Sequence, residues 1–443
     1  MRTPFKRSQC TRLISSLFVM FSITTAQAMD LSSTVEDAIM HNPEFREQIK
    51  QHQGIQADFK GAEGSWYPKI DLTTGLGLED IDRAGANKTS LTRTEMSARL
   101  TQNIFEGYGT VNEITRQQAR LDSSAHSAQA KANQIALDMV TAYLNLLKEQ
   151  ELKQLAVESK STHERILDQI TQRTQAGIGN QVEVDQAKAR LALSNSNLMA
   201  AHNNYNDALA RFQRVLGRMP DHSLVKPNLE IIFPETMDEA INVALISHPT
   251  LRSANADIAQ ARAQNEAASG SFYPRVDFEL EQTFDNNTNG IEGKNNNLQA
   301  MFRLRYNLYN GGKDTANRER TATSVQQAAE IRNNSRRQVI ENLSYAWAAK
   351  TYVSEQLGFI HQHIQLTHET LIGYRKQFSL GRRSLLDLLN TEDEYISALI
   401  SLVESEADYT IAEYRILNAM GKLTDALGVE VKYANVENDY SNE

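Results

Sequence analysis

Cysteine is almost absent from the sequence. Cys10 is the single cysteine among 443 residues, and it lies in an amino-terminal stretch that differs from the rest of the chain. A lone cysteine excludes an internal disulfide and a cysteine-ligated metal. Histidine does not fill the gap, because His361 and His368, which share a helix face, are two turns apart and too distant to chelate one ion. We expect no metal site and no cofactor.

Catalytic signatures are missing as well. No nucleophile, base and acid form a recognisable constellation, and Gly311-Gly312-Lys313 lacks the rest of a phosphate-binding loop. We therefore expect that the protein is not an enzyme and that a partner supplies the energy for its work.

Basic charge is scarce. The chain has 46 Lys and Arg against 55 Asp and Glu, and four of the bases fall within the first 12 residues, which hold no acid. This basic stretch, the apolar run 13–23 and Ala26-Gln27-Ala28 are typical of a secretory signal peptide over 1–28. Its removal leaves 42 bases against 55 acids, a net charge of −13, which argues against nucleic acid as a partner.

Long hydrophobic runs are absent after Ile23. No later segment has the roughly 18 uncharged apolar residues that a membrane-spanning helix requires. If the protein sits in a membrane, it must span it with β-strands, which are the other way to pair the backbone in lipid.

The chain does contain an internal tandem duplication. Three segments recur at offsets of 206 or 204 residues: 38–46 as 244–252, 66–72 as 272–278, and 103–107 as 307–311. A single length change of two residues reconciles the offsets, so the repeats cover nearly the whole chain. We assign 29–217 to the first repeat, 218–235 to a proline-containing linker, 236–421 to the second repeat and 422–443 to an acidic tail that is only partly ordered.

Each repeat has one segment in which apolar and polar residues alternate. These segments predict β-hairpins at about 68–105 and 274–309, with one apolar face and one polar or charged face, as in a membrane barrel with a wet lumen. Four strands cannot close a barrel, and an open sheet in lipid leaves unpaired edges. The chain must therefore oligomerise, and three copies would supply twelve strands.

A very long helix follows each hairpin. The proline-free patterns over roughly 108–176 and 312–378 predict rods of about 100 Å, and shorter helices return antiparallel to them. Two adjacent apolar seams indicate a helix with neighbours on both sides, as in a helical barrel, although the core of a four-helix bundle explains a broad apolar face equally well. The helix length and the neighbouring strands favour the barrel. The hairpin tips fall near 177–183 and 381–387.

Taken together, these motifs resemble the TolC family of outer-membrane efflux and type I secretion proteins over essentially all of 30–421. The motifs occur in the same order in both repeats: Asn42-Pro43 and His248-Pro249, Tyr67-Pro68 and Tyr273-Pro274, Phe105-x-Gly107 and Tyr309-x-Gly311, Gly177 with Glu183 and Gly381 with Asp387, and Leu216-Gly217 and Met420-Gly421. Each motif alone is weak, but the repeated order is specific.

The resemblance implies a fold and a set of partners. The fold is a homotrimer with a 12-stranded β-barrel, four strands per chain, in the outer membrane of a Gram-negative bacterium. The barrel continues into a long α-helical coiled-coil barrel in the periplasm. The partners are a periplasmic adaptor, an inner-membrane ABC or other transporter, and outer-membrane lipid.

The resemblance also bears on the cargo. Cys10 precedes the apolar run and is not placed for lipidation, which favours the non-lipidated branch and, within it, type I protein secretion over multidrug or small-molecule efflux. A structural coiled-coil protein of the envelope, or an adhesin, is the alternative of another class, and the four alternating strands disfavour it.

The resemblance further implies roles for residues at the tips. Asp387 and Asn390 match the ring that narrows the tunnel entrance, with an amide in place of the family's usual second acid. Arg383 matches the arginine that locks the closed gate to a neighbouring hairpin, and Glu183 is its expected partner. Small residues that line the adaptor groove match three positions: Gly177, Ser379 and Gly381. Asp387 is alternatively a solvated charge near a turn, and both glycines are also explained as helix C-caps.

Overall fold

The structure is a computed structural model that describes residues 29–85, 88–228 and 233–431. The predicted signal peptide, 1–28, lies outside the described residues, as does the acidic tail from 432 onward. Among the described residues, no helix is both long enough and apolar enough to cross a membrane.

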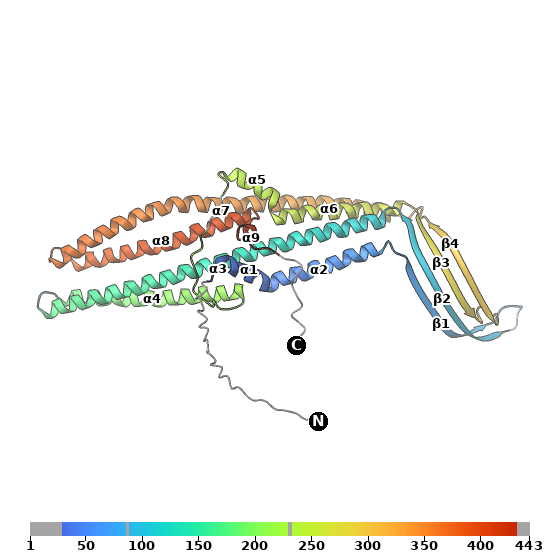
Figure 1. The fold of residues 1–443 in the computed structure, drawn as a ribbon, viewed down its shortest axis with the longest axis horizontal. Coiled ribbons are helices and arrows are strands. Elements are labelled where there is room, and N and C mark those ends of the chain that lie inside the picture. The colour runs from blue at the N-terminus through green and yellow to red at the C-terminus, as the bar shows by residue number, and fades with distance from the viewer. Residues whose placement is uncertain (1–28, 86–87, 229–232, 432–443) are drawn as a thin grey trace, which may run out of the picture.

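The molecule is a long rod of helices with a four-stranded sheet at one end (Figure 1). The first repeat contains α1 (Leu31–His41), α2 (Pro43–Gly64), β1 (Lys69–Ile81), β2 (Thr89–Glu106), α3 (Gly109–Gln175) and α4 (Gln181–Leu216). The second contains α5 (Met237–Ser247), α6 (Pro249–Ser269), the 3-10 turn η1 (Gly270–Phe272), β3 (Arg275–Asn286), β4 (Lys294–Arg305), α7 (Lys313–Ser379) and α8 (Leu385–Ala419). A one-turn helix, α9 (Leu423–Ala426), follows.

The two repeats begin with the same helix break. Asn42 and His248 adopt extended backbone angles before a proline, because the residue before proline is pushed out of the helical region. Each then caps the following helix, with Asn42 accepting from the Glu44 amide at 2.8 Å and His248 accepting from the Thr250 amide at 3.3 Å. The proline occupies the first helical turn, where no amide hydrogen is needed.

The four strands form one antiparallel sheet in the order β1-β2-β3-β4. The register aligns apolar residues in rows across all four strands, for example Ile70 with Leu100, Leu280 and Ala300. On this face Leu78 is 87% exposed and Phe302 is 71% exposed, while the other face carries the charges described below. Strand β4 ends at Arg305, four residues short of the predicted 309, because its pairing partner there, Arg275, is the first residue of β3.

The helices α3 and α7 each run for 67 residues, and α4 and α8 return beside them. The main core lies halfway along the rod, where α1, α5 and α9 pack against the long helices (Figure 1). Its largest fully buried side chains include Phe45, Tyr143, Phe212 and Tyr414. The predicted four strands per chain, long helices and tandem duplication are therefore all present in the fold.

Two segments are better packed than the sequence predicts. In the expected tail, Leu423 is fully buried, and Asn133 of α3 accepts hydrogen bonds from the amide and the hydroxyl of Thr424. In the proline-containing linker, Leu224 forms a β-bridge with Met29, and the Tyr143 hydroxyl donates to the carbonyl oxygen of either Met29 or Val225 at 2.7 Å. Apolar side chains from both segments complete the core. The acidity of the tail and the prolines of the linker gave no indication of this packing in the sequence.

Candidate functional site

The two helical hairpins end in tips of the same construction. Gly177 after α3 and Gly381 after α7 adopt φ values of +77° and +72°, in the left-handed region that glycine enters without strain. Each amide bonds back to a carbonyl near the end of the preceding helix, at Thr174 and Phe378 respectively. A Cβ atom at either glycine would meet nothing within 4 Å, so backbone conformation, and not close packing, requires glycine here.

The returning helices begin with equivalent caps. Asn180 caps α4 by accepting from the Glu183 amide at 3.0 Å, and Ser384 caps α8 by accepting from the Asp387 amide at 3.2 Å. Both acids thus occupy the third helical position, where the helix dipole favours a negative charge. This local role explains why each tip has an acid six residues after its glycine, and it is compatible with a further role for Asp387 at the entrance.

Arg383 contacts its own hairpin. Its Nε lies 3.3 Å from Asp387 Oδ2 as an ion pair without hydrogen-bond geometry, and its guanidinium stacks over the Tyr374 ring at 3.9 Å and bonds to the Tyr374 hydroxyl. Within the described part of one chain, Arg383 forms no ion pair with Glu183. The predicted lock therefore stays a prediction about contacts between neighbouring chains.

A different arginine joins the two hairpins of one chain. Arg190 of α4 places Nη1 2.7 Å from Asp393 Oδ2 and Nη2 2.7 Å from Asn390 Oδ1, both on α8. Asp393 also lies 3.3 Å from Nε2 of His163, a residue of α3 that is only 4% exposed. We call Arg190, His163, Asn390 and Asp393 the hairpin clasp. Sequence reasoning missed Arg190 because nothing in its local pattern shows that α4 and α8 meet.

A small apolar cluster lies beside the clasp, separate from the main core. Five buried residues of α3, α4 and α8 form it: Ile166, Ile170, Val184, Leu385 and Leu389. Next to it, Arg375 of α7 binds the buried carboxylate of Glu392 on α8 at 2.6 Å. The tips of one chain are thus held together by both packing and ion pairs.

A groove of about 850 Å³ runs along the tips on the α3 and α7 side. Ser379, the last residue of α7, forms part of its wall together with Ile178, Phe378 and three arginines, Arg165, Arg173 and Arg375. Gly177 and Gly381 lie at the turns next to it and are exposed. The structure therefore places Ser379 in a groove, whereas the two glycines shape the turns.

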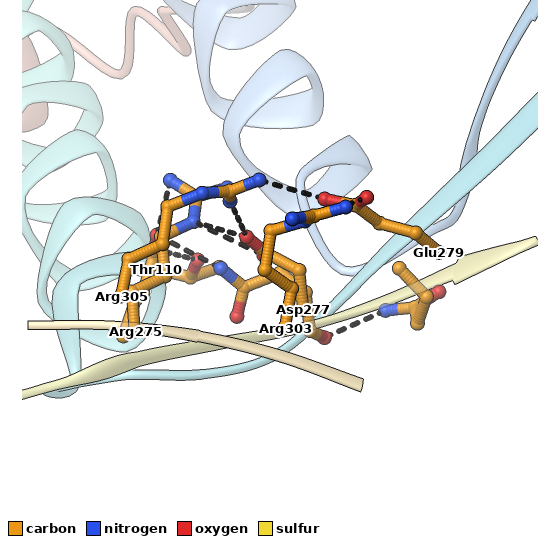
Figure 2. Close-up of polar contacts among 9 residues, drawn as sticks. Thr110, Arg275, Asp277, Glu279, Arg303 and Arg305 are labelled. Atoms are coloured by element: carbon orange, nitrogen blue, oxygen red, sulfur yellow. Dashed lines mark hydrogen bonds and ion pairs between the residues drawn. The ribbon is translucent and has the colours of Figure 1, made fainter. Parts of the chain in front are cut away.

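The charged face of the sheet is the second candidate site. Near the junction of sheet and helices, Asp277 of β3 is fully buried between two arginines (Figure 2). Arg305 of β4 reaches Asp277 at 2.6 Å and Glu279 at 2.7 Å, and Arg275 donates to both Asp277 oxygens at 3.0 Å. Arg303 adds a 2.9 Å bond to Glu279. We call these five residues the junction network.

The network continues beyond the strands and along the sheet. Arg275 also lies 3.5 Å from Glu106, which accepts a hydrogen bond from Thr110 in the first turn of α3, so the charges of the sheet are tied to the start of the long helix. Farther along, Arg99 pairs with Glu281 at 2.7 Å. Acids and bases on this face largely neutralise one another.

The connection between β3 and β4 folds back over the far end of this same face. The Gly290 amide donates to Glu79 of β1 at 2.8 Å, and Arg83 donates to the Asn289 carbonyl at 3.2 Å. A Cβ atom at Gly290 would lie 3.1 Å from the Thr89 hydroxyl and 3.3 Å from Ile81. The loop therefore crosses β2 on the charged side and narrows the space above it.

Comparison with known proteins agrees with this architecture. The family model described as outer membrane efflux protein matches residues 34–218 and 240–422, one match for each repeat. The outer membrane efflux protein BepC of Brucella suis is 22% identical over 86% of this chain and 82% of its own length. The alkaline protease secretion protein AprF of Pseudomonas aeruginosa is 20% identical over 94% and 90%.

A solved structure shares the fold. The CmeC outer membrane channel of Campylobacter jejuni superimposes with a TM-score of 0.78 at 16% identity, over 89% of this chain and 86% of that one. The match extends over strands and helices together, so the sheet and the helical rod belong to one architecture.

Proposed function

This chain belongs to the outer membrane efflux protein family, and we propose that it is the outer-membrane duct of a type I protein-secretion system. Proteins of this family are outer-membrane channels of efflux systems, and they act as homotrimers. In the trimer, three four-stranded sheets close into a 12-stranded barrel, which pairs the free edges of β1 and β4. The helical hairpins continue the barrel as a tunnel into the periplasm.

The faces of the sheet support this arrangement. The exposed apolar residues of β1 and β4 face lipid, and the junction network faces the lumen, where water and ion pairing satisfy its charges. The hairpin tips then lie at the inner end of the tunnel, with Asp387 and Asn390 at the entrance.

The similarity to AprF is the observation that favours a protein as the cargo. That relative is a secretion protein for a protease, and the match covers nine-tenths of both chains. The sequence feature that agrees is the lack of a cysteine positioned for lipidation. Small-molecule efflux is the second candidate, and the similarity to the efflux protein BepC supports it.

The proposed machine needs two partners. A periplasmic adaptor docks at the tips, where the groove beside Ser379 offers a surface between the hairpins, and an inner-membrane transporter provides the energy. The duct itself is passive.

A deletion strain tests the cargo. We expect loss of a large secreted protein from the medium, with little change in sensitivity to drugs and detergents. The reverse pattern, with normal secretion and increased drug sensitivity, would favour small-molecule efflux. Complementation with the full-length gene controls for effects on neighbouring genes.

A further inference from the structure

A third cluster of charges lies far from both the tips and the sheet, on the wall of the tunnel. A cavity of about 660 Å³ opens between α3, α4 and α8 at the level of the main core. Three arginines line it, Arg211 and Arg214 from α4 and Arg415 from α8. Neither the hairpin tips nor the junction network includes any of them.

The guanidinium groups of Arg211 and Arg415 are free to bind a ligand. Within the described parts of the chain, neither residue makes an ion pair or a hydrogen bond, and both are exposed. Two of the three acids of the cavity already accept hydrogen bonds from neighbouring side chains, and Glu149 lies near a lysine but keeps one buried oxygen, Oε2, without a partner among the described residues. Asp138 accepts from Gln134 at 3.0 Å, Asp207 accepts from Asn203 at 3.1 Å, and Glu149 lies 3.5 Å from Lys148.

The basic side chains that act on the carboxyl group of Asp138 are Arg214 and Lys131. Burial raises the pKa of its carboxyl group, although Gln134 and the nearby Arg214 oppose this effect. A carboxylate that is partly desolvated and already bonded elsewhere leaves the guanidinium groups available.

The duplication places the two free arginines at equivalent positions. Arg415 follows Arg211 by 204 residues, the same offset that relates the repeat-closing glycines Gly217 and Gly421. Arg211 lies six residues before Gly217, and Arg415 lies six residues before Gly421. In a trimer, the two positions therefore become six around the axis.

The cavity opens on the inner side of the wall. On α3, the residues that line it, including Asn145 and Lys148, lie on the face opposite Tyr143. Tyr143 bonds to Met29 and to the linker at Val225, on the side where α1 packs. Three copies of α1 and of the linker would fill the bore if they lay inside it, so that side is the outside and the arginines face the bore.

We propose that Arg211 and Arg415, supported by Arg214, form an arginine collar that binds the carboxylate groups of cargo passing along the tunnel. Guanidinium groups pair with carboxylates in a bidentate geometry, and six of them around one axis offer successive contacts to an acidic segment. This inference rests on the proposed role as a duct but not on the choice between protein and small-molecule cargo.

Ion flow through purified full-length trimers in a planar bilayer tests the collar. An oligoglutamate peptide and citrate, each added from the extracellular side, are the two probes. We expect the double variant R211Q/R415Q to raise the half-blocking concentration of oligoglutamate by about tenfold, since several charge-assisted bonds are lost. We also expect its reversal potential in a salt gradient to shift toward cation selectivity.

The conservative double variant R211K/R415K is the matched control. It keeps the charge, so its reversal potential stays near the wild-type value, while its block by oligoglutamate weakens because lysine lacks the bidentate fork. Weakened block by the peptide alone assigns the collar to polypeptide carboxylates, and weakened block by citrate as well assigns it to carboxylates in general.

Unchanged block and unchanged reversal potential in assembled R211Q/R415Q trimers would overturn the collar. Heat-modifiable migration on gels checks assembly, and the single variants R211Q and R415Q supply the measurement if the double variant does not assemble. A negative result in the bilayer experiment would not change the secretion result expected for a deletion strain. The collar and the proposed function can therefore be refuted independently.

Discussion

Arg190 in the first helical hairpin binds Asp393 in the second at 2.7 Å, across 203 residues of sequence. The same guanidinium holds Asn390, one of the two residues expected at the tunnel entrance. The position of Asn390 is therefore coupled to the contact between the two hairpins of one chain. Opening of the entrance by separation of these hairpins would have to break the clasp.

Charge reversal at the clasp should loosen the tips. We expect Arg190→Asp to make cells more sensitive to bulky antibiotics, because each broken pair of this partly exposed kind removes about 1 kcal/mol from the closed state. The measurement is antibiotic susceptibility at matched expression. The double variant R190D/D393R restores the pair with reversed polarity and should regain resistance, and sensitivity equal to the single variant would contradict the role of the clasp.

The predicted lock between chains has its own test. Arg383→Glu should increase antibiotic sensitivity whether Arg383 acts through Glu183 of a neighbouring chain or only through Asp387 and Tyr374 of its own hairpin. Glu183→Gln separates the two possibilities. If Glu183 is the partner, this variant leaks as well, whereas a leaky R383E beside a tight E183Q would restrict the function of Arg383 to its own tip.

Asp277 should contribute more to the stability of the trimer than Asp71 does. Asp277→Asn leaves Arg275 and Arg305, both about half exposed, without the buried carboxylate that both bind, and loss of a hydrogen bond to a charged group costs about 1.5–3 kcal/mol. The trimer should dissociate at a clearly lower temperature on gels. Asp71, the equivalent residue of the first repeat, is 45% exposed in a pair with Lys69, so Asp71→Asn is the control and should change little. Equal effects of the two substitutions would refute this assignment.

His248 should make stability depend on pH. Burial lowers the pKa of its imidazole from 6.5 to about 4, so the unfolded chain binds the proton more readily than the folded chain. The contribution of the neutral imidazole is complete above pH 6.5 and is lost as the pH falls from 6.5 to about 4, by up to about 3 kcal/mol per chain. The measurement is unfolding by denaturant at pH 7 and pH 4.

His248→Asn is the matched variant, because Asn42 caps the equivalent helix in the first repeat. The variant should keep the cap and lose less stability than the wild-type protein between pH 7 and pH 4. An identical loss in both proteins would show that other groups account for the acid sensitivity.

The duplication made much of this architecture predictable. Period-two alternation identified the strands, Tyr-Pro and Asn-Pro or His-Pro marked the helix boundaries, and glycine with a following cap and acid marked each tip. These signals are local, because each depends on backbone preferences of neighbouring residues. They also explain why the predicted tips near 177–183 and 381–387 coincide with the turns between the long helices.

The same duplication gives a wrong expectation of burial where the tertiary contacts of the two repeats differ. Asp71 and Asp277 occupy equivalent positions, yet the second is fully buried because β3 lies between two strands, whereas the first lies on the sheet edge. Likewise, the acidity of the segment after Gly421 gave no sign that Leu423 would be buried in the main core.

The amino-acid sequence by itself determined the repeat, the order of strands and helices, and the turns, since these follow from local periodicity and from residues that stop or cap helices. Only the tertiary structure decided that Arg190 meets Asp393, that Arg383 turns to Tyr374, and that Arg211 and Arg415 share one cavity. The first and third of these relationships join helices about two hundred residues apart in sequence, and the second spans nine residues around one tip. Their geometry depends on how the helices pack, which no local pattern encodes.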